Sequence, residues 1–170
     1  MARYQAIVQS PRPPAQTFGY LATFSNASQW DPGVLAAEQL DPGPVILGTR
    51  FRLVVPFLGF RMPLTYRVTR YQPDHDVVLT AASGLLRTTD EIAVTGGGDG
   101  SVVTYKAEVQ LRGPLRLLDP LLRPGFRAVG DRAAAGLAQA LAENQASQTT
   151  RSPGTAALTG RADPPRTDRP

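Results

Sequence analysis

Residues 114–145 read PLRLLDPLLRPGFRAVGDRAAAGLAQALAENQ, and the spacing of their apolar residues indicates a long amphipathic helix. Apolar positions recur every three or four residues and form one stripe: Leu115, Leu118, Leu122, Phe126, Val129, Ala133, Leu137 and Leu141. Asp119 and Pro120 fit a helix start, because proline is favoured at the first helical position. We predict a short helical turn at 114–119, then a helix from 120 to 145 that its prolines kink, about 39 Å long.

Upstream of this helix the apolar period changes to two, which is typical of half-buried strands. The sequence predicts strands at 4–10, 34–40, 47–57, 60–69, 75–82, 85–94 and 101–111. A helix that starts at Pro14 and a second short helix or turn at 25–30 follow the first strand. The short turns between successive strands indicate an antiparallel meander, whose apolar face gives the long helix a surface to lie on.

The composition indicates one domain, at 1–145, followed by a disordered polar tail at 146–170. Hydrophobic residues make up 42% of the 170 residues and charged residues 19%, which is ordinary for a globular protein. The sequence holds no cysteine, so disulfides and thiolate chemistry are excluded. It also holds no leader-like apolar segment and no run long enough to span a bilayer, so we expect a cytoplasmic protein without a transmembrane segment.

The net charge of +4 does not indicate nucleic-acid binding. Residues 1–145 hold 14 Lys+Arg against 12 Asp+Glu, and the basic residues are dispersed instead of clustered. The 17 arginines and single lysine, with abundant Ala, Gly and Pro, are typical of a G+C-rich bacterial genome. We therefore expect no nucleic-acid partner.

Four short motifs add a family resemblance to this element order. They are Trp30-Asp31-Pro32-Gly33, Gly48-Thr49-Arg50-Phe51, Tyr66-Arg67-Val68-Thr69 and Gly136-Leu137. In this order and spacing, residues 3–143 resemble the START-like superfamily, and most closely the bacterial polyketide cyclase/dehydratase-like proteins of the SRPBCC family. The resemblance implies an α+β helix-grip fold, in which a curved seven-stranded antiparallel sheet wraps the long C-terminal helix around an apolar cavity.

Several large side chains are predicted to lie between sheet and helix, where they would either line a ligand cavity or fill a core. The predicted ligand-binding residues are mostly apolar, as in known small-molecule pockets: Trp30, Phe51, Leu53, Phe57, Phe60, Met62, Leu64, Tyr66, Thr88, Tyr105 and Phe126. Trp30, the only tryptophan, would either gate the mouth of the cavity or plug it.

Asp90 is the candidate for chemistry. It shares its strand parity with the apolar Leu86 and Ile92, and so does Thr88, so both polar side chains are predicted to point inward. A carboxylate in an apolar cavity should have a raised pKa and could act as polar anchor or general base, with Tyr66 or Tyr105 as its hydroxyl partner. The alternatives are a bulge that places Asp90 at the rim, or an ion pair with an arginine such as Arg87 or Arg112.

Other kinds of site find little support in the sequence. His75, the only histidine, lies in a turn-like Pro73-Asp74-His75-Asp76 and is predicted to be exposed, so we expect no metal site and no cofactor. The glycines at 96–100 join two strands instead of opening a helix, so they form a hairpin tip and not a phosphate loop. No G-x-S-x-G motif of a serine hydrolase occurs.

Three functions remain. The first is a carrier or binding protein for a small hydrophobic molecule such as a lipid, polyketide or isoprenoid. The second is a polyketide cyclase or dehydratase in which Asp90 and a tyrosine, with Tyr105 as the candidate, provide acid/base catalysis. The third is a protein-interaction module with a closed core. The sequence leaves open a transient membrane contact and a homodimer.

Overall fold

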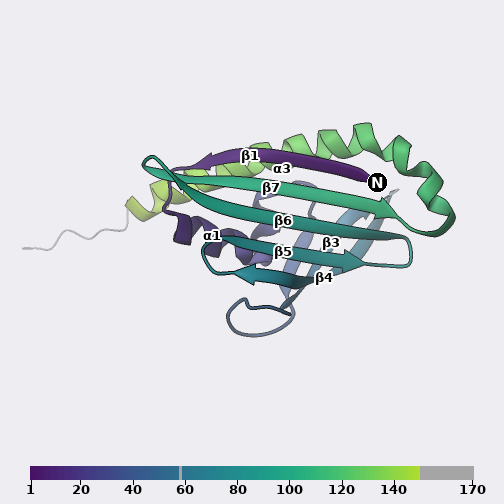
Figure 1. The fold of residues 1–170 in the computed structure, drawn as a ribbon, viewed down its shortest axis with the longest axis horizontal. Coiled ribbons are helices and arrows are strands. Elements are labelled where there is room, and N and C mark those ends of the chain that lie inside the picture. The colour runs from purple at the N-terminus through teal and green to yellow at the C-terminus, as the bar shows by residue number, and fades with distance from the viewer. Residues whose placement is uncertain (58, 150–170) are drawn as a thin grey trace, which may run out of the picture.

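The computed structural model describes residues 1–57 and 59–149 and confirms the predicted element order (Figure 1). Strand β1 (Ala2–Ser10) is followed by helix α1 (Pro14–Ala22), a 3-10 turn η1 (Phe24–Asn26) and helix α2 (Ala27–Trp30). Six strands come next: β2 (Ala36–Gln39), β3 (Arg50–Phe57), β4 (Phe60–Gln72), β5 (Asp76–Ala82), β6 (Leu86–Gly97) and β7 (Gly100–Leu111). A 3-10 turn, η2 (Gly113–Leu118), leads into the long helix α3 (Asp119–Thr149).

Several predicted boundaries differ from the structure by two to four residues, and two of them matter here. Helix α3 ends at Thr149 instead of 145, so the first residues assigned to the tail are helical, while residues 150–170 lie outside the described part of the chain. Strand β3 begins at Arg50 instead of 47, because Gly48, with a φ of 93°, turns the chain just before it. Leu47, the first residue of the predicted strand, therefore lies outside β3 and is 63% exposed. No helix among the described residues is long and apolar enough to cross a membrane.

The seven strands form one antiparallel sheet in the order β1-β7-β6-β5-β4-β3-β2. Every strand from β2 to β6 pairs with its successor, and β1 pairs with β7. This is the predicted meander, with the first strand added at the far edge. The pairing of β4 with β5 shifts between Val68 and Arg70. Such a bulge bends and twists a strand, which helps the sheet curve around its contents.

Helix α3 runs alongside β1 at one edge of the sheet (Figure 1). Two of its glycines allow this close approach. A Cβ at Gly130 would clash with the ring of Tyr4 on β1, and a Cβ at Gly136 would clash with the backbone oxygen of Trp30 at the end of α2. Glycine at these positions therefore lets the helix contact β1 and α2 directly.

The second half of α3 closes one end of the fold with a filled core. Leu137 and Leu141 are fully buried, as the predicted stripe requires. The buried Arg12 donates from Nε to the Leu141 carbonyl at 3.2 Å and from a terminal nitrogen to the Ala140 carbonyl at 3.3 Å. Its guanidinium therefore ties the segment after β1 to the helix. The side chains of Leu115, Leu118 and Leu122, the first three members of the stripe, lie outside the described part.

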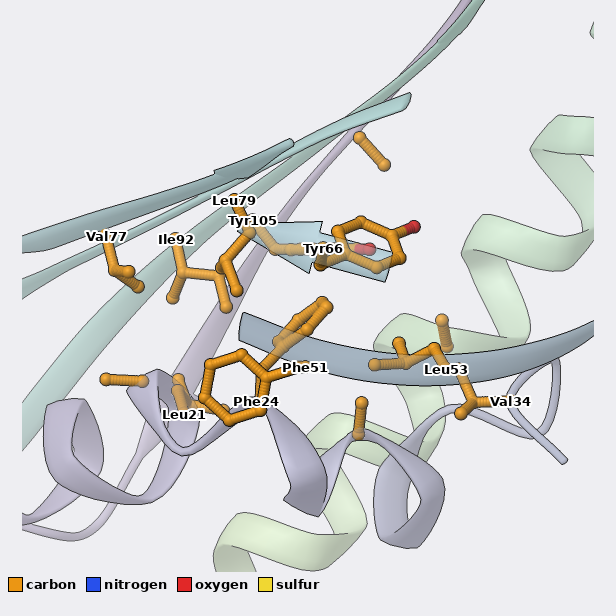
Figure 2. Packing of buried hydrophobic residues seen from close by; sticks show 14 of the residues in the cluster. Leu21, Phe24, Val34, Phe51, Leu53, Tyr66, Val77, Leu79, Ile92 and Tyr105 are labelled. Carbon is orange, nitrogen blue, oxygen red and sulfur yellow. The ribbon is translucent and has the colours of Figure 1, made fainter. Parts of the chain in front are cut away.

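The interior beneath the middle of the sheet is packed around an aromatic group. Figure 2 shows Phe24 beside Phe51, below Tyr66. The ring of Phe24 meets that of Phe51 at 6.2 Å and that of Tyr66 at 5.3 Å, both edge to face. This geometry is favourable for aromatic pairs. The segment between α1 and α2 is thus held against the face of β3 and β4.

Candidate functional site

A cavity of about 370 Å³ lies between the sheet, the α2 segment and the first half of α3. Its wall takes residues from β1, β3, β4, β6 and β7, from the stretch 24–34 and from residues 125–133 of α3. The volume falls in the range of small-molecule sites, which runs from about 300 to 1,000 Å³. The predicted space between sheet and helix is therefore open, and it does not match the closed core that the interaction-module hypothesis requires.

The wall is mostly apolar, with polar groups confined to a few positions. The structure places ten of the predicted residues on this wall: Trp30, Leu53, Phe57, Met62, Leu64, Tyr66, Thr88, Asp90, Tyr105 and Phe126. Strand parity brings most of them there, since alternate residues of β3, β4, β6 and β7 face the same side. Their contact with a ligand remains a prediction.

Asp90 is buried, with 5% of its surface exposed, and its partners are hydroxyl groups. The Tyr105 hydroxyl donates to Asp90 Oδ1 at 2.6 Å, and the Thr88 hydroxyl approaches Oδ2 at 3.4 Å. Asp90 stands opposite Ala107 in the β6–β7 register, so no bulge moves it to the rim. The predicted alternatives, a rim position or an arginine ion pair, are therefore wrong for this carboxylate, and Arg112 donates to the Ser83 carbonyl instead.

Burial changes the acidity of the whole group. It raises the pKa of Asp90 to about 6, while hydrogen bonds from Tyr105, Tyr66 and Thr88 favour the carboxylate and limit this rise. Burial also raises the pKa of both Tyr66 and Tyr105 well above the usual value, and the negative charge of Asp90 adds to it. The tyrosines therefore stay protonated near neutrality, while Asp90 titrates close to it. Figure 2 shows the two tyrosine hydroxyls pointing away from the packed side chains of Val77 and Ile92.

A second carboxylate, Asp31, lines the same cavity. It follows α2, and its Oδ1 accepts a hydrogen bond from the Gly33 N–H at 2.7 Å. Burial raises the pKa of Asp31, and that N–H opposes the rise. The sequence identified Asp31 only as part of the Trp30-Asp31-Pro32-Gly33 motif, because nothing in the local pattern indicates that its carboxylate lines the cavity.

Trp30 is part of the wall instead of a gate at the mouth. Only 2% of its surface is exposed, and its ring meets that of Tyr105 edge to face at 5.7 Å. The indole Nε1 is the one buried side-chain nitrogen or oxygen that lacks a hydrogen-bond partner among the described residues. A buried donor without an acceptor is costly, so an oxygen on a bound molecule would stabilise it.

Two predicted lining residues lie elsewhere. Phe51 is fully buried, because Phe24 from η1 covers its ring and makes it part of the packed core. Phe60 is 77% exposed, because it opens β4 at the hairpin tip. The pairing of β4 with β5 starts only at Tyr66, so the neighbouring strand does not reach Phe60. Both residues have the inward parity. Strand parity therefore determines which face of the sheet a side chain lies on, and the neighbouring elements determine whether it is buried, exposed or beside the cavity.

Phe126 and Val129 border the cavity from α3 and are not buried in a core. Phe126 is half-buried, and Val129 is 42% exposed. Tyr4 on β1 and Phe24 on η1 also line the cavity, and sequence analysis missed both. Tyr4 shares its parity with the buried Val8, which was the available signal; Phe24 lies in an irregular segment that has no period to follow.

Residues 1–142 match the family model described as polyketide cyclase / dehydrase and lipid transport. No curated protein matches the chain. Among solved structures, TTHA0849 from Thermus thermophilus is similar at 16% identity with a TM-score of 0.67, covering 84% of this chain and 97% of its own. The Zhui aromatase/cyclase from Streptomyces sp. R1128 is similar at 15% identity with a TM-score of 0.66, covering 89% and 97%.

A START superfamily protein from Mycobacterium smegmatis is similar at 13% identity with a TM-score of 0.62, covering 88% of this chain and 99% of its own. At these identities the structural likeness shows the fold alone, which is the helix-grip fold expected from the sequence. The family model adds the assignment, because its match extends over the strands, the cavity and most of α3. The chain belongs to the polyketide cyclase / dehydrase and lipid transport family.

Proposed function

We propose that this protein binds and carries a small hydrophobic molecule in the cavity between the sheet and α3. The observation that carries the proposal is the cavity itself, with its apolar wall and its polar group gathered around Asp90. Apolar burial would supply affinity at about 25 cal/mol per Å². The hydroxyls of Tyr66 and Tyr105, with the unpaired Trp30 N–H, would orient the bound molecule.

A fluorescent apolar probe, N-phenyl-1-naphthylamine, tests this proposal by titration. We expect saturable binding of one probe per chain. Val129→Phe places a ring into the cavity from a partly exposed position that tolerates a larger side chain, and it should weaken binding by about tenfold or more. Ala128→Phe is the matched control, because Ala128 is exposed and does not line the cavity. Equal affinity for all three proteins, or no binding, would contradict the proposal.

The second candidate function is a cyclase or dehydratase, and the pairing of Asp90 with Tyr105 is the observation that favours it. The carboxylate has a pKa of about 6, close to the value that suits a general base near neutral pH. In this reaction Asp90 would take a proton from the carbon next to a carbonyl, while a tyrosine hydroxyl would donate to the carbonyl oxygen. The cavity would fold a flexible polyketide chain into a reactive conformation.

Asp90→Asn separates the two candidates. A carrier should keep its affinity for N-phenyl-1-naphthylamine within a fewfold, since most of the wall is unchanged. An acid/base enzyme should lose turnover of a poly-β-ketone thioester by about a hundredfold or more, measured by mass spectrometry of the cyclised product. Wild-type protein that gives no product above the uncatalysed rate would leave the carrier function as the one supported.

A further inference from the structure

The charge in the cavity is of one sign. Asp31 and Asp90 both line it, and none of the lining residues in the described part of the chain is Lys, Arg or His. Asp31 also acts on the group around Asp90: after the larger effect of burial, its negative charge contributes to the raised pKa of Asp90 and of both tyrosines. Asp90 is buried and Asp31 is partly buried, and neither has a cationic partner among the described residues. Carboxylates removed from water are stabilised by such a partner, which a ligand could supply.

The wall around the two carboxylates is rich in aromatic rings. Seven aromatic side chains line the cavity: Tyr4, Phe24, Trp30, Phe57, Tyr66, Tyr105 and Phe126. Trp30 and Tyr105 are in contact with each other, and Tyr105 also donates to Asp90. Ring faces attract a cation, most strongly for tryptophan and when water is excluded. Carboxylates and aromatic rings in one enclosed space form the environment that stabilises an ammonium group.

The hydrogen bonds around Asp90 also favour a head group that donates hydrogen bonds. The Tyr105 hydroxyl uses its only proton on the carboxylate, so its oxygen offers lone pairs to the cavity. Thr88 is oriented towards the other carboxylate oxygen and is limited in the same manner. A ligand head group that donates hydrogen bonds is therefore favoured beside Asp90. A carboxylate would meet two carboxylates in the cavity, and the Trp30 N–H is the one buried side-chain donor without a partner among the described residues.

Charges at the rim do not reverse this balance. Arg127 and Asp131 act on Tyr4 from α3, and both are exposed. They carry opposite signs and lie where water screens them. Among the described residues, the charges that line the cavity are therefore those of Asp31 and Asp90.

We infer that the cavity takes apolar amines, with the ammonium group between the carboxylates and the aromatic rings, and that it rejects apolar carboxylates of the same size. The inference rests on the proposed binding function and names the chemical class of its ligand. The selecting residues are Asp31 and Asp90, which supply the charge, and Trp30 and Tyr105, which supply the rings nearest to it.

A matched series of three probes tests the inference by calorimetric or fluorescence titration near neutral pH. 1-Naphthylmethylamine, 1-naphthylmethanol and 1-naphthoate share one ring system and differ in the charge of the head group. The amine should bind at least about tenfold more tightly than the carboxylate, with the alcohol in between. A carboxylate or an alcohol that binds as tightly as the amine would overturn the inference and leave the binding function intact. Absence of binding by all three would overturn both.

Variants then locate the selectivity. Asp31→Asn and Asp90→Asn should each reduce the preference for the amine over the carboxylate. They should mainly lower the affinity for the amine, while the affinity for the alcohol changes little. Asp99→Asn is the matched control, because it removes the same charge from an exposed residue at the β6–β7 hairpin tip, outside the cavity. If Asp99→Asn reduced the preference as much as the other two, net charge would explain it and the inference would fail.

Discussion

The two halves of α3 share one apolar stripe but face different surroundings. In the second half, Leu137 and Leu141 are fully buried in the hydrophobic core. In the first half, Phe126 is half-buried and Val129 is 42% exposed, and both border the cavity. One periodic pattern thus serves as core at one end and as cavity wall at the other. The difference arises from what lies opposite the helix, not from the helix.

The comparison predicts its largest effect for substitutions along the stripe. Leu137→Ala should lower the free energy of unfolding by about 2–5 kcal/mol, because it leaves a hole in a filled core. Phe126→Ala should cost about 1 kcal/mol or less, because the ring already borders open space. Urea unfolding of the two variants measures both. Equal costs of several kcal/mol would mean that the first half of α3 is packed like the second.

Substitutions of a polar residue beside the cavity and of one in the filled core should differ in how their effect on stability depends on pH. The folded-state pKa of Asp90, about 6, exceeds its ordinary value of 3.8, so folding favours the protonated form. The stability that this preference provides is present below about pH 4 and is lost as pH rises through about 6. The free energy of unfolding of Asp90→Asn, relative to that of wild type, should therefore increase by up to about 3 kcal/mol between pH 4 and pH 8. Urea unfolding at the two pH values measures this difference.

Thr17 on α1, in the filled core, provides the control. Its hydroxyl lies 2.8 Å from that of Ser101 and 3.0 Å from that of Ser10, in a buried cluster without a carboxylate. Thr17→Val should cost about 1–3 kcal/mol, and this cost should be the same at both pH values. A pH-independent difference for Asp90→Asn would show that its carboxylate is hydrated.

Two glycines of α3 test the close contact of the helix with α2. Gly136→Ala would place a Cβ in steric clash with the Trp30 backbone oxygen, so the helix must shift, at a cost of about 1–3 kcal/mol. Gly125→Ala, in the half that borders the cavity, meets no atom within 4 Å. It should stabilise the protein by up to about 1 kcal/mol, because alanine favours the helix. Thermal unfolding measures both variants. An equal decrease in the melting temperature of the two would contradict the comparison.

The sequence predicted the fold well because each element has a period or a breaker that can be read locally. Parity alone placed Thr88 and Asp90 on the inner face, and the structure puts both beside Tyr105. The same parity did not predict the surroundings of Phe51 and Phe60. Phe51 is in the packed core because Phe24 covers its ring, and Phe60 is exposed because β5 does not extend as far as this residue. Asp31 was missed because its role depends on strands β4 and β6, far away in the sequence.

The most direct test of the account is native mass spectrometry of the protein purified without organic solvent. The account predicts a bound mass of a few hundred daltons on wild type, released by organic solvent, and reduced or absent on Val129→Phe while retained on Ala128→Phe. A mass that persists equally on all three proteins would place the bound molecule outside the cavity. A wild-type chain that stays at its own mass even after incubation with 1-naphthylmethanol or N-phenyl-1-naphthylamine would contradict the central claim.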